Sequence, residues 1–208
     1  MKRKLWVKIF PVLLIIAILF SGCISTTVEE NASDVGQGTA TTGVQQDTAT
    51  RSPYYTEDLQ IIKVYVKCVA SCHLDGDTIR VVMPDGKEEK VRLIGVNTPE
   101  LSHFGKPEQC GAKIARDYTD QLTGSYVWLE LDVAPRDKYG RILAYVWTKD
   151  PRTVNFDLEY MWNWRLVRYG YAQVMTIPPN VKYAREFVRA ERKAREENIG
   201  LWKICSDY

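Results

Sequence analysis

The stretch TIRVVMPDGKEEKVRLIG, residues 78–95, contains two β-branched, apolar segments joined by the turn PDGK. β-Branched residues favour strands, and Asp-Gly supplies the positive φ that a tight hairpin turn requires. The stretch therefore predicts a β-hairpin with strands at 78–83 and 88–95. The rest of the chain can be interpreted outward from this hairpin.

Three further segments have the composition of strands. IIKVYVKCVA (61–70) is β-branched and alternates between apolar and polar residues. YVWLELDV (126–133) and RILAYVW (141–147) flank the turn PRDKYG, which predicts a second strand pair. Five short, mostly alternating strands favour a small closed barrel.

Three segments show helical periodicity. The first carries apolar residues at Ile114, Ala115, Tyr118 and Leu122. A second helix is predicted after Asn155, a residue type that caps helix N-termini, and a third over 180–197, ending near Gly200. The predicted fold class is α+β, a five-stranded β-barrel with about three helices.

Residues 1–23 have the three-part pattern of a secretory signal, namely basic MKRKLWVK, apolar IFPVLLIIAILF and then SGC. The small residues before Cys23 resemble a lipoprotein cleavage box, in which this cysteine carries a lipid and becomes the mature N-terminus. The alternative is an uncleaved anchor helix, although the apolar run is short for a span that needs about 20 residues. Both interpretations predict a protein outside the cytoplasm, tethered to the outer face of the cell membrane.

The chain after the signal divides into two parts by composition. Residues 24–58 are rich in Thr, Ser, Gly, Gln and Asp, and they bury too little apolar surface to offset their ordering entropy. They are predicted to form a flexible tether. Residues 59–208 contain enough Val, Ile, Leu, Trp and Tyr for one folded domain.

The net charge argues against a broad basic surface for nucleic acid. The full chain carries +2, of which Lys2, Arg3, Lys4 and Lys8 contribute four positive charges in the signal. Six acidic residues against Arg51 give segment 24–58 a net charge of −5, so residues 59–208 carry +3. Any phosphate-binding site must therefore be local.

Four cysteines lie in the predicted domain, at Cys68, Cys72, Cys110 and Cys205. In an extracytoplasmic domain an even count favours disulfides, and four cysteines allow three connectivities. Pairing of Cys68 with Cys72 is disfavoured if they share a strand, because four strand residues span about 13 Å. A zinc site at Cys72 lacks a repeated C-x-x-C spacing.

Three short segments carry the side chains that chemistry needs: LDGDT (74–78), RLIGVNTPE (92–100) and DKYGR (137–141). Each one alone is typical of an ordinary turn or strand end. Together they offer the Asp77 carboxylate, the Asn97 amide oxygen and the Thr98 backbone carbonyl or hydroxyl. Such hard oxygens are suited to Ca²⁺, which has a high and flexible coordination number.

The same segments contain groups that act on phosphate. Arg92 and Arg141 have planar guanidinium groups that match pairs of phosphate oxygens. Glu100 follows Pro99 and can activate or orient water, while a cation and the arginines stabilise charge on the phosphoryl oxygens. These are the components needed to hydrolyse a phosphodiester.

At this point the chain resembles the staphylococcal nuclease (thermonuclease) family over roughly residues 65–203. The resemblance rests on DGDT, RLIGVNTPE, DKYGRILAYVW, LVRYGYAQV and the closing GLW, in the expected order and spacing. It implies a five-stranded OB-fold β-barrel with about three helices. It also implies calcium-dependent cleavage of DNA and RNA at the 5′ P–O bond, which leaves 3′-phosphates.

The resemblance also implies roles for individual residues. Asp77, Asn97 and the Thr98 carbonyl match the ligands of one calcium ion, with Asp75 in its outer shell. Catalytic positions match Arg92, Glu100 and Arg141. Lys138 and Tyr139 match positions that contact the terminal phosphate of a bound nucleotide.

Two departures from the family pattern bear on function. Asn97 stands where the family has an aspartate, and the lost charge predicts weaker calcium binding rather than a dead site. MTIPPN (175–180) replaces tyrosines that pack on a nucleotide base, which predicts looser base contacts.

The leading hypothesis is a membrane-tethered nuclease that acts on DNA and RNA with little sequence specificity. This hypothesis implies no obligate protein partner. The competing hypothesis is a catalytically silent OB-type module that binds nucleic acid or another ligand at the cell surface. Asn97 and the missing tyrosines motivate this second hypothesis.

Overall fold

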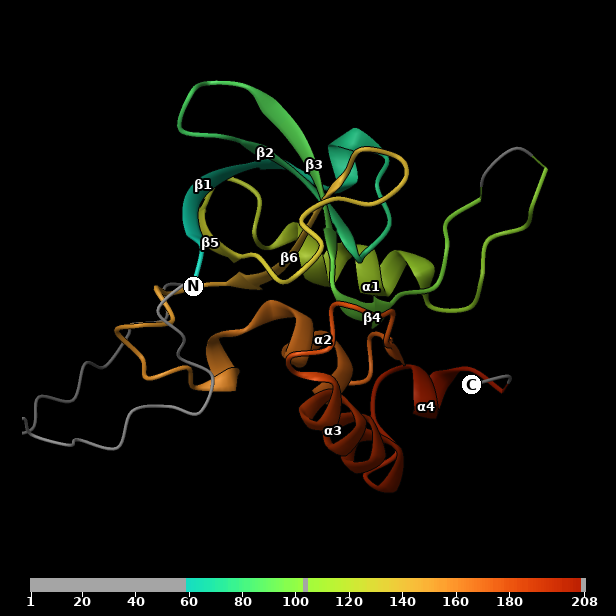
Figure 1. The fold of residues 1–208 in the computed structure, drawn as a ribbon. Helices are drawn as coiled ribbons and strands as arrows, with labels where there is room; N and C mark the ends of the chain where they lie inside the picture. Colours follow the sequence, from blue (N-terminus) through green and yellow to red (C-terminus); the bar gives the residue numbers. More distant parts are fainter. Residues whose placement is uncertain (1–58, 103–104, 207–208) are drawn as a thin grey trace, which may run out of the picture. The chain divides into compact units, whose positions relative to one another are not determined.

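The barrel predicted from the sequence is present in the computed structural model, which describes residues 59–102 and 105–206. Five strands close into it in the order β1-β2-β3-β6-β5 (Figure 1). The closed barrel and its helices confirm the α+β, OB-type fold. The barrel strands are β1 (Ile61–Cys68), β2 (Thr78–Val82), β3 (Glu88–Leu93), β5 (Tyr126–Glu130) and β6 (Ile142–Trp147).

Four of the five strand pairings in the barrel are antiparallel, and the fifth, between β3 and β6, is parallel. In the parallel pair Val91 lies opposite Ile142, and Arg92 lies opposite Leu143. The turn of the β2–β3 hairpin has Gly86 at φ 84°, as the Asp-Gly pair predicts. The parallel pairing brings the end of β3 next to the start of β6.

A second, two-stranded sheet pairs β4 (Gly95–Asn97) with β7 (Gln173–Met175). It was not predicted, because each strand has only three residues. Gly95 joins β3 to β4 with φ 80°, and a Cβ there would lie 2.3 Å from Cε2 of Phe187. Only glycine therefore fits this sharp bend between β3 and β4.

Helices cover one end and one side of the barrel. Within the described residues they are α1 (Ala112–Asp120), α2 (Trp162–Arg168), α3 (Ala184–Glu196) and α4 (Leu201–Ile204), with 3₁₀ turns at Ala70–Cys72 and Leu158–Tyr160. The predicted cap at Asn155 is wrong. Asp157 instead caps the second 3₁₀ turn by accepting a hydrogen bond from the Glu159 backbone N–H, and α2 begins later, at Trp162.

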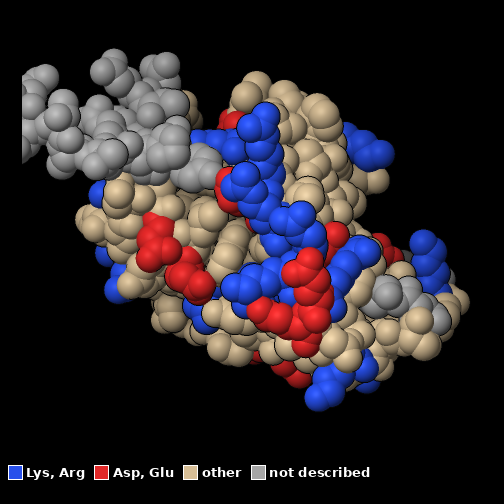
Figure 2. Space-filling model, turned by 90° about the horizontal axis from the view of Figure 1, so that it is seen from below, with Lys and Arg blue, Asp and Glu red and all other residues tan. Residues whose placement is uncertain are grey.

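The outer face of α3 is strongly charged. Its inward residues Phe187, Ala190 and Ala194 are buried, and basic residues alternate with glutamates on the outside. Figure 2 looks from below at the side where α3 lies and shows a band of lysine and arginine with acidic side chains beside it. Glu191 turns back toward the sheet and accepts a hydrogen bond from the Val174 N–H, which ties α3 to β7.

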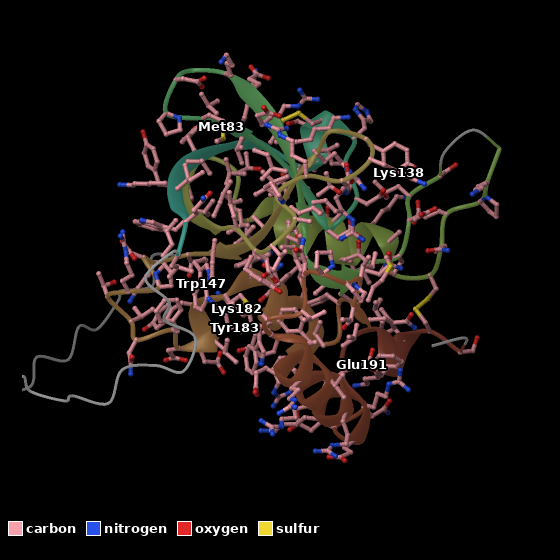
Figure 3. The ribbon with its side chains drawn as sticks, viewed as in Figure 1. Met83, Lys138, Trp147, Lys182, Tyr183 and Glu191 are labelled. Atoms are coloured by element: carbon pink, nitrogen blue, oxygen red, sulfur yellow. A yellow bond between two sulfur atoms is a disulfide. The ribbon has the colours of Figure 1, made fainter. Side chains whose placement is uncertain are left out.

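A buried carboxylate joins the barrel to the segment before α3. Glu130 is fully buried and accepts hydrogen bonds from Trp147 Nε1 at 2.8 Å, Lys182 Nζ at 2.6 Å and Tyr183 Oη at 3.0 Å. Figure 3 shows Trp147, Lys182 and Tyr183 close together. Burial raises the pKa of Glu130, although these hydrogen bonds oppose the shift. The cluster satisfies a charge that would otherwise be costly in the core.

The barrel interior is filled by alternate strand residues, and burying each one stabilises the fold by about 1.5–3 kcal/mol. They include Val64, Val66, Ile79, Val81, Val91, Leu93, Val127 and Leu129. The buried amide of Asn163 on α2 makes three hydrogen bonds to the backbone of two segments. It donates to the carbonyls of Ile94 and Ala144 and accepts from the Val146 N–H at 2.8 Å. This side chain holds β6 and the β3–β4 bend in fixed register.

Both disulfides are visible. Cys110 pairs with Cys205, and Cys68 pairs with Cys72, with Cα–Cα distances of 5.9 and 5.7 Å. Pairing of Cys68 with Cys72 was disfavoured only for cysteines that share a strand. That condition does not hold, because β1 ends at Cys68 and a 3₁₀ turn brings Cys72 back toward it.

Predictions about the N-terminal region cannot be compared with the fold. The signal 1–23, its lipid-bearing Cys23 and the tether 24–58 lie outside the described residues. Among the residues that the structure describes, no helix combines the length and apolar character needed to cross a membrane.

Candidate active site

A cleft of about 610 Å³ lies where several loops meet beside the end of β3. Eight of the predicted site residues line it: Asp75, Asp77, Arg92, Asn97, Glu100, Lys138, Tyr139 and Arg141. They come from segments up to 66 positions apart in the sequence, Asp75 to Arg141. Thr98, the remaining predicted calcium ligand, is fully buried next to the cleft.

Asp77 is fixed by two hydrogen bonds and one ion pair. Its Oδ1 accepts from the Thr78 hydroxyl at 3.0 Å, and its Oδ2 accepts from the Thr98 N–H at 3.1 Å. Arg92 Nη2 lies 3.0 Å from the same Oδ2. Asp75 supports the neighbouring backbone, because its Oδ1 accepts from the Leu101 N–H at 2.9 Å. The two acidic residues thus hold segment 97–101 in place.

The turn that presents these two carboxylates packs against α1. A Cβ at Gly76 would lie 2.7 Å from the backbone carbon of Ala115, so the close approach needs glycine. The hydroxyl of Thr119 donates to the Gly76 carbonyl at 2.6 Å. The D-G-D sequence therefore does more than form a turn, because its glycine lets the loop rest directly on the helix.

Arg92 is held rigidly at the floor of the cleft. Its Nη1 donates to the carbonyls of Leu93 and Val96, each at 2.8 Å, and its Nη2 donates to Asn97 Oδ1 at 3.3 Å. Its side chain is only 12% exposed. Burial lowers the pKa of Arg92 from its ordinary value, and the nearby Asp77 charge opposes that shift. The guanidinium is therefore placed by several contacts before any substrate arrives.

One side-chain oxygen of Asp77 and one of Asn97 lie close together, since each is within 3.3 Å of the same Arg92 nitrogen. The Thr98 hydroxyl is buried and has no hydrogen-bond partner among the described residues. The oxygens of one carboxylate and one amide are hard ligands, which suit Ca²⁺ better than they suit softer metal ions. No group of three or more His, Cys, Asp or Glu suited to a metal occurs in the described part of the chain.

Glu100 has an exposed side chain on a well-fixed backbone. Its N–H donates to Gln109 Oε1 at 2.7 Å, and its carbonyl accepts from the Gln109 N–H at 3.0 Å. Within the described residues its carboxylate makes no hydrogen bond or ion pair. The carboxylate is thus available to a group that enters the cleft.

Arg141 is oriented by Asp137, a residue that the sequence analysis did not single out. Asp137 Oδ2 accepts from Arg141 Nε at 2.7 Å, and its Oδ1 accepts from the N–H groups of Tyr139 and Arg141. Burial favours a higher pKa for Asp137, but the hydrogen bonds from Arg141 and Tyr139 together lower it. The first aspartate of a D-x-x-G turn is a known side-chain cap, so this signal was present in the sequence.

An exposed tyrosine lies between two cations at the mouth of the cleft. Tyr139 is 71% exposed, and Lys138 Nζ and Arg141 Cζ lie 5.0 and 5.6 Å from its ring centroid. Figure 3 labels Lys138 on its loop. Two positive charges beside an exposed ring suit a ligand that combines phosphate with an aromatic base.

Part of the cleft wall is aliphatic. Met175, Ile177, Pro178 and Pro179 line it. The buried amide of Asn180 fixes the wall by exchanging two hydrogen bonds of 2.8 Å with the Ala134 backbone. The sequence analysis missed Asn180, because a buried asparagine in a loop has no distinctive spacing.

The chain is similar to several known proteins. A family model described as "Staphylococcal nuclease homologue" matches residues 90–204. The "Thermonuclease" of Staphylococcus intermedius is 40% identical over 131 residues, which cover 62% of this chain and 72% of that protein. "Endonuclease YncB" of Bacillus subtilis is 29% identical over 208 residues, which cover 94% of this chain and 91% of that protein.

"Uncharacterized protein MJ1439" of Methanocaldococcus jannaschii is 33% identical over 149 residues, which cover 62% of this chain and 68% of that protein. The matched region of the family model contains Arg92, Asn97, Glu100 and Arg141, whereas Asp77 precedes it.

Proposed function

Because the chain belongs to the staphylococcal nuclease family, we propose that it is a nuclease that hydrolyses phosphodiester bonds in DNA and RNA with little sequence specificity. The proposal includes dependence on one calcium ion and products that end in 3′-phosphates. Its main support is the convergence of Arg92, Glu100 and Arg141 on the cleft that also holds Asp77 and Asn97.

The two arginines have different tasks in this proposal. Arg92 is fixed by two carbonyls, Asp77 and Asn97, so it presents a preorganised charge to a phosphoryl oxygen. Arg141 is held only through its Nε, and its terminal nitrogens make no hydrogen bond within the described residues. These nitrogens can therefore donate hydrogen bonds to two oxygens of the phosphate as negative charge increases in the transition state.

Glu100 supplies the base in the same scheme. Its carboxylate takes a proton from a water molecule whose oxygen bonds to phosphorus, while the P–O5′ bond breaks and the leaving 5′ oxygen takes a proton from a solvent water molecule. Calcium bound by the oxygens of Asp77, Asn97 and Thr98 would supply positive charge next to the phosphoryl group. Lys138 and Tyr139 lie where they can bind the neighbouring nucleotide.

The competing hypothesis, a silent binding module, fits the position of Glu100 less well. A protein that only binds nucleic acid gains nothing from an exposed carboxylate in a phosphate-binding cleft, since like charges repel. The Glu100 carboxylate lines the cleft and has no partner among the described residues that neutralises it. This residue therefore favours hydrolysis over binding alone.

The proposal is tested by incubating the full chain with single-stranded DNA and RNA at calcium concentrations up to the millimolar range. We expect cleavage of both, a loss of cleavage when calcium is chelated, and 3′-phosphate ends on the products. Arg141→Ala serves as the matched control. Cleavage by the wild type that does not exceed that of Arg141→Ala at any calcium concentration would refute the proposal.

We also propose that the nuclease is held outside the cell by a lipid on Cys23, with segment 24–58 as its tether. The sequence pattern around Ser21-Gly22-Cys23 supports this location. Replacing Cys23 with serine is expected to move the protein from the membrane fraction to the soluble fraction. An unchanged membrane fraction would instead support an uncleaved anchor helix.

A further inference from the structure

The outer face of β1 and β5 carries aromatic side chains that the proposed active site does not use. Tyr126 is 60% exposed and Tyr65 is 37% exposed, and the two lie opposite each other across the strand pair. Trp128 is half-buried beside them, opposite Lys63. Strand alternation directs Val64 and Val127 into the barrel and these four residues outward.

The four side chains form one surface, which we call the β1–β5 platform: Lys63, Tyr65, Tyr126 and Trp128. The ring centroids of Tyr65 and Tyr126 are 5.5 Å apart, in an edge-on arrangement. Lys63 Nζ lies 4.9 Å from the centroid of Tyr126 and 5.2 Å from that of Trp128. Within the described residues Lys63 has no acidic partner, so its charge remains available to a ligand.

Positive charge continues from the platform across the neighbouring strands. Lys67 on β1 and Arg80 on β2 share a single acidic partner, Glu88. Arg80 lies opposite Lys90 on β3, and Lys90 is exposed. Two residues further along the same outward face of β3 is Arg92, at the floor of the cleft. The outward residues thus lead from the platform toward the proposed active site.

We propose that the β1–β5 platform is a second binding site for single-stranded nucleic acid, which holds the substrate strand beyond the nucleotides in the cleft. The inference rests on the proposed function, because it assigns the platform to the same substrate. Exposed rings beside a lysine without an acidic partner provide both contacts that unpaired strands need, namely base stacking and phosphate binding. In duplex DNA the base faces are stacked on one another, so the platform can bind a duplex only through its phosphates.

The platform compensates for the aliphatic wall of the cleft. Met175 and Ile177 offer no ring on which a base can stack, so the cleft itself binds bases weakly. Tyr65 and Tyr126 provide that stacking elsewhere on the barrel. A short oligonucleotide that fills only the cleft gains nothing from them, whereas a longer strand does.

The first test measures binding without chemistry. The full chain in a chelating buffer is titrated against fluorescein-labelled oligothymidylates of about 4 and about 16 nucleotides, which bracket the usual site sizes of OB folds. Fluorescence anisotropy gives the Kd at several salt concentrations. The variants are Tyr126→Ala and Lys63→Gln. Their matched controls are Tyr126→Phe, which keeps the ring, and Lys203→Gln, which removes an exposed lysine on α4.

Tyr126→Ala is expected to weaken binding of the long strand about tenfold without changing its salt dependence, because only stacking is lost. Lys63→Gln is expected to reduce the slope of log K against log salt by about 0.7, the value for one phosphate contact on a single strand. Both variants leave the Kd of the short strand unchanged. Tyr126→Phe and Lys203→Gln match the wild type. Lys63→Gln keeps all three aromatic rings of the platform. It therefore still tests the inference if Tyr126→Ala does not fold.

The inference is overturned if the Kd for the long strand is unchanged in both variants. It is also overturned if Lys203→Gln weakens binding of the long strand as much as Lys63→Gln does. The second test separates this failure from that of the proposed function, by measuring calcium-dependent cleavage of the same two oligonucleotides. If the wild type cuts both strands but KM for the long strand is the same in Tyr126→Ala, the nuclease proposal stands and the platform fails. If the wild type cuts neither strand, the proposed function fails, and a length-dependent Kd still supports a binding site.

Discussion

Arg92 and Asp77 are joined at 3.0 Å, between Nη2 and Oδ2, and the same nitrogen lies 3.3 Å from Oδ1 of Asn97. One guanidinium therefore touches both side chains that we propose as calcium ligands. In this proposal the oxygens of Asp77 and Asn97 contact both the calcium ion and Arg92. The charge of these two side chains therefore affects the binding of the ion and the position of the arginine.

The first prediction concerns this charge. Replacing Asn97 with aspartate adds a carboxylate to the oxygen set, and calcium affinity rises with ligand charge. We expect the calcium concentration for half-maximal cleavage to fall severalfold in Asn97→Asp. Calcium titrations of activity, with Asn97→Ala as the control, provide the measurement. An unchanged or higher calcium requirement in Asn97→Asp would mean that this side chain does not face the ion.

The second prediction separates catalysis from binding. Glu100→Gln keeps the shape of the side chain and removes its ability to accept a proton, so kcat should fall by about 10²–10⁴-fold. The Kd for single-stranded DNA should stay within a few-fold of the wild-type value, because no phosphate contact is lost. Single-turnover cleavage and anisotropy measure the two quantities. Equal losses of binding and turnover would contradict the role of Glu100.

The third prediction tests Asp137 as a positioning residue for Arg141. Asp137→Asn weakens the bond to Arg141 Nε, and kcat should fall more than KM rises, since the guanidinium acts mainly in the transition state. Arg141→Lys is a useful comparison, because it keeps the charge but loses the planar fork. If Asp137→Asn raises KM and leaves kcat unchanged, Asp137 does not position Arg141 for the reaction.

The same pair should also affect stability in a pH-dependent manner. The pKa of Asp137 is below its ordinary value of 3.8 in the folded protein, so the carboxylate stabilises the fold at all pH values above that range. The free energy of unfolding should then exceed that of Asp137→Asn by ~1–3 kcal/mol at neutral pH. The difference should begin to shrink as the pH falls below about 4, where Asp137 of the unfolded chain takes up a proton, and it should disappear as the pH falls through the lowered pKa of the folded state. Urea unfolding at several pH values measures this difference.

The fourth prediction concerns the two disulfides, which close loops of very different length. Cys110–Cys205 has a sequence separation of 95, and Cys68–Cys72 has one of 4. Loop-closure entropy then predicts that the longer bridge contributes about 5 kcal/mol to stability and the shorter one about 2 kcal/mol. Unfolding of the double variants Cys110→Ser/Cys205→Ser and Cys68→Ser/Cys72→Ser provides the comparison. A larger loss for the second pair would contradict the entropic argument.

Much of the architecture follows from local patterns in the sequence. The Asp-Gly turn and the alternating strands predicted the barrel, because both signals depend on neighbouring residues only. The segments around Asp77, Arg92 and Arg141 predicted a shared cleft, and the structure brings them together. Their roles in calcium binding and catalysis are still predictions.

The remaining features depend on contacts between distant segments. β4 and β7 are too short to show a period, and they form only because the Gly95 bend brings them together. Asn163 and Asn180 stabilise the site through buried amides whose backbone partners no spacing in the sequence reveals. The sequence left the pairing of Cys68 with Cys72 open, because nothing in its pattern reveals the 3₁₀ turn at Ala70–Cys72 that brings the two cysteines together.

The parallel pairing of β3 with β6 has a consequence for how the protein is made. Val91 pairs with Ile142, 51 positions later, so the barrel cannot close until most of the chain has left the ribosome. Long-range pairings of this kind are slow to form, because the intervening loop must be ordered first. The barrel wall that carries Arg92 is therefore complete only after β6, which ends at Trp147, has been synthesised.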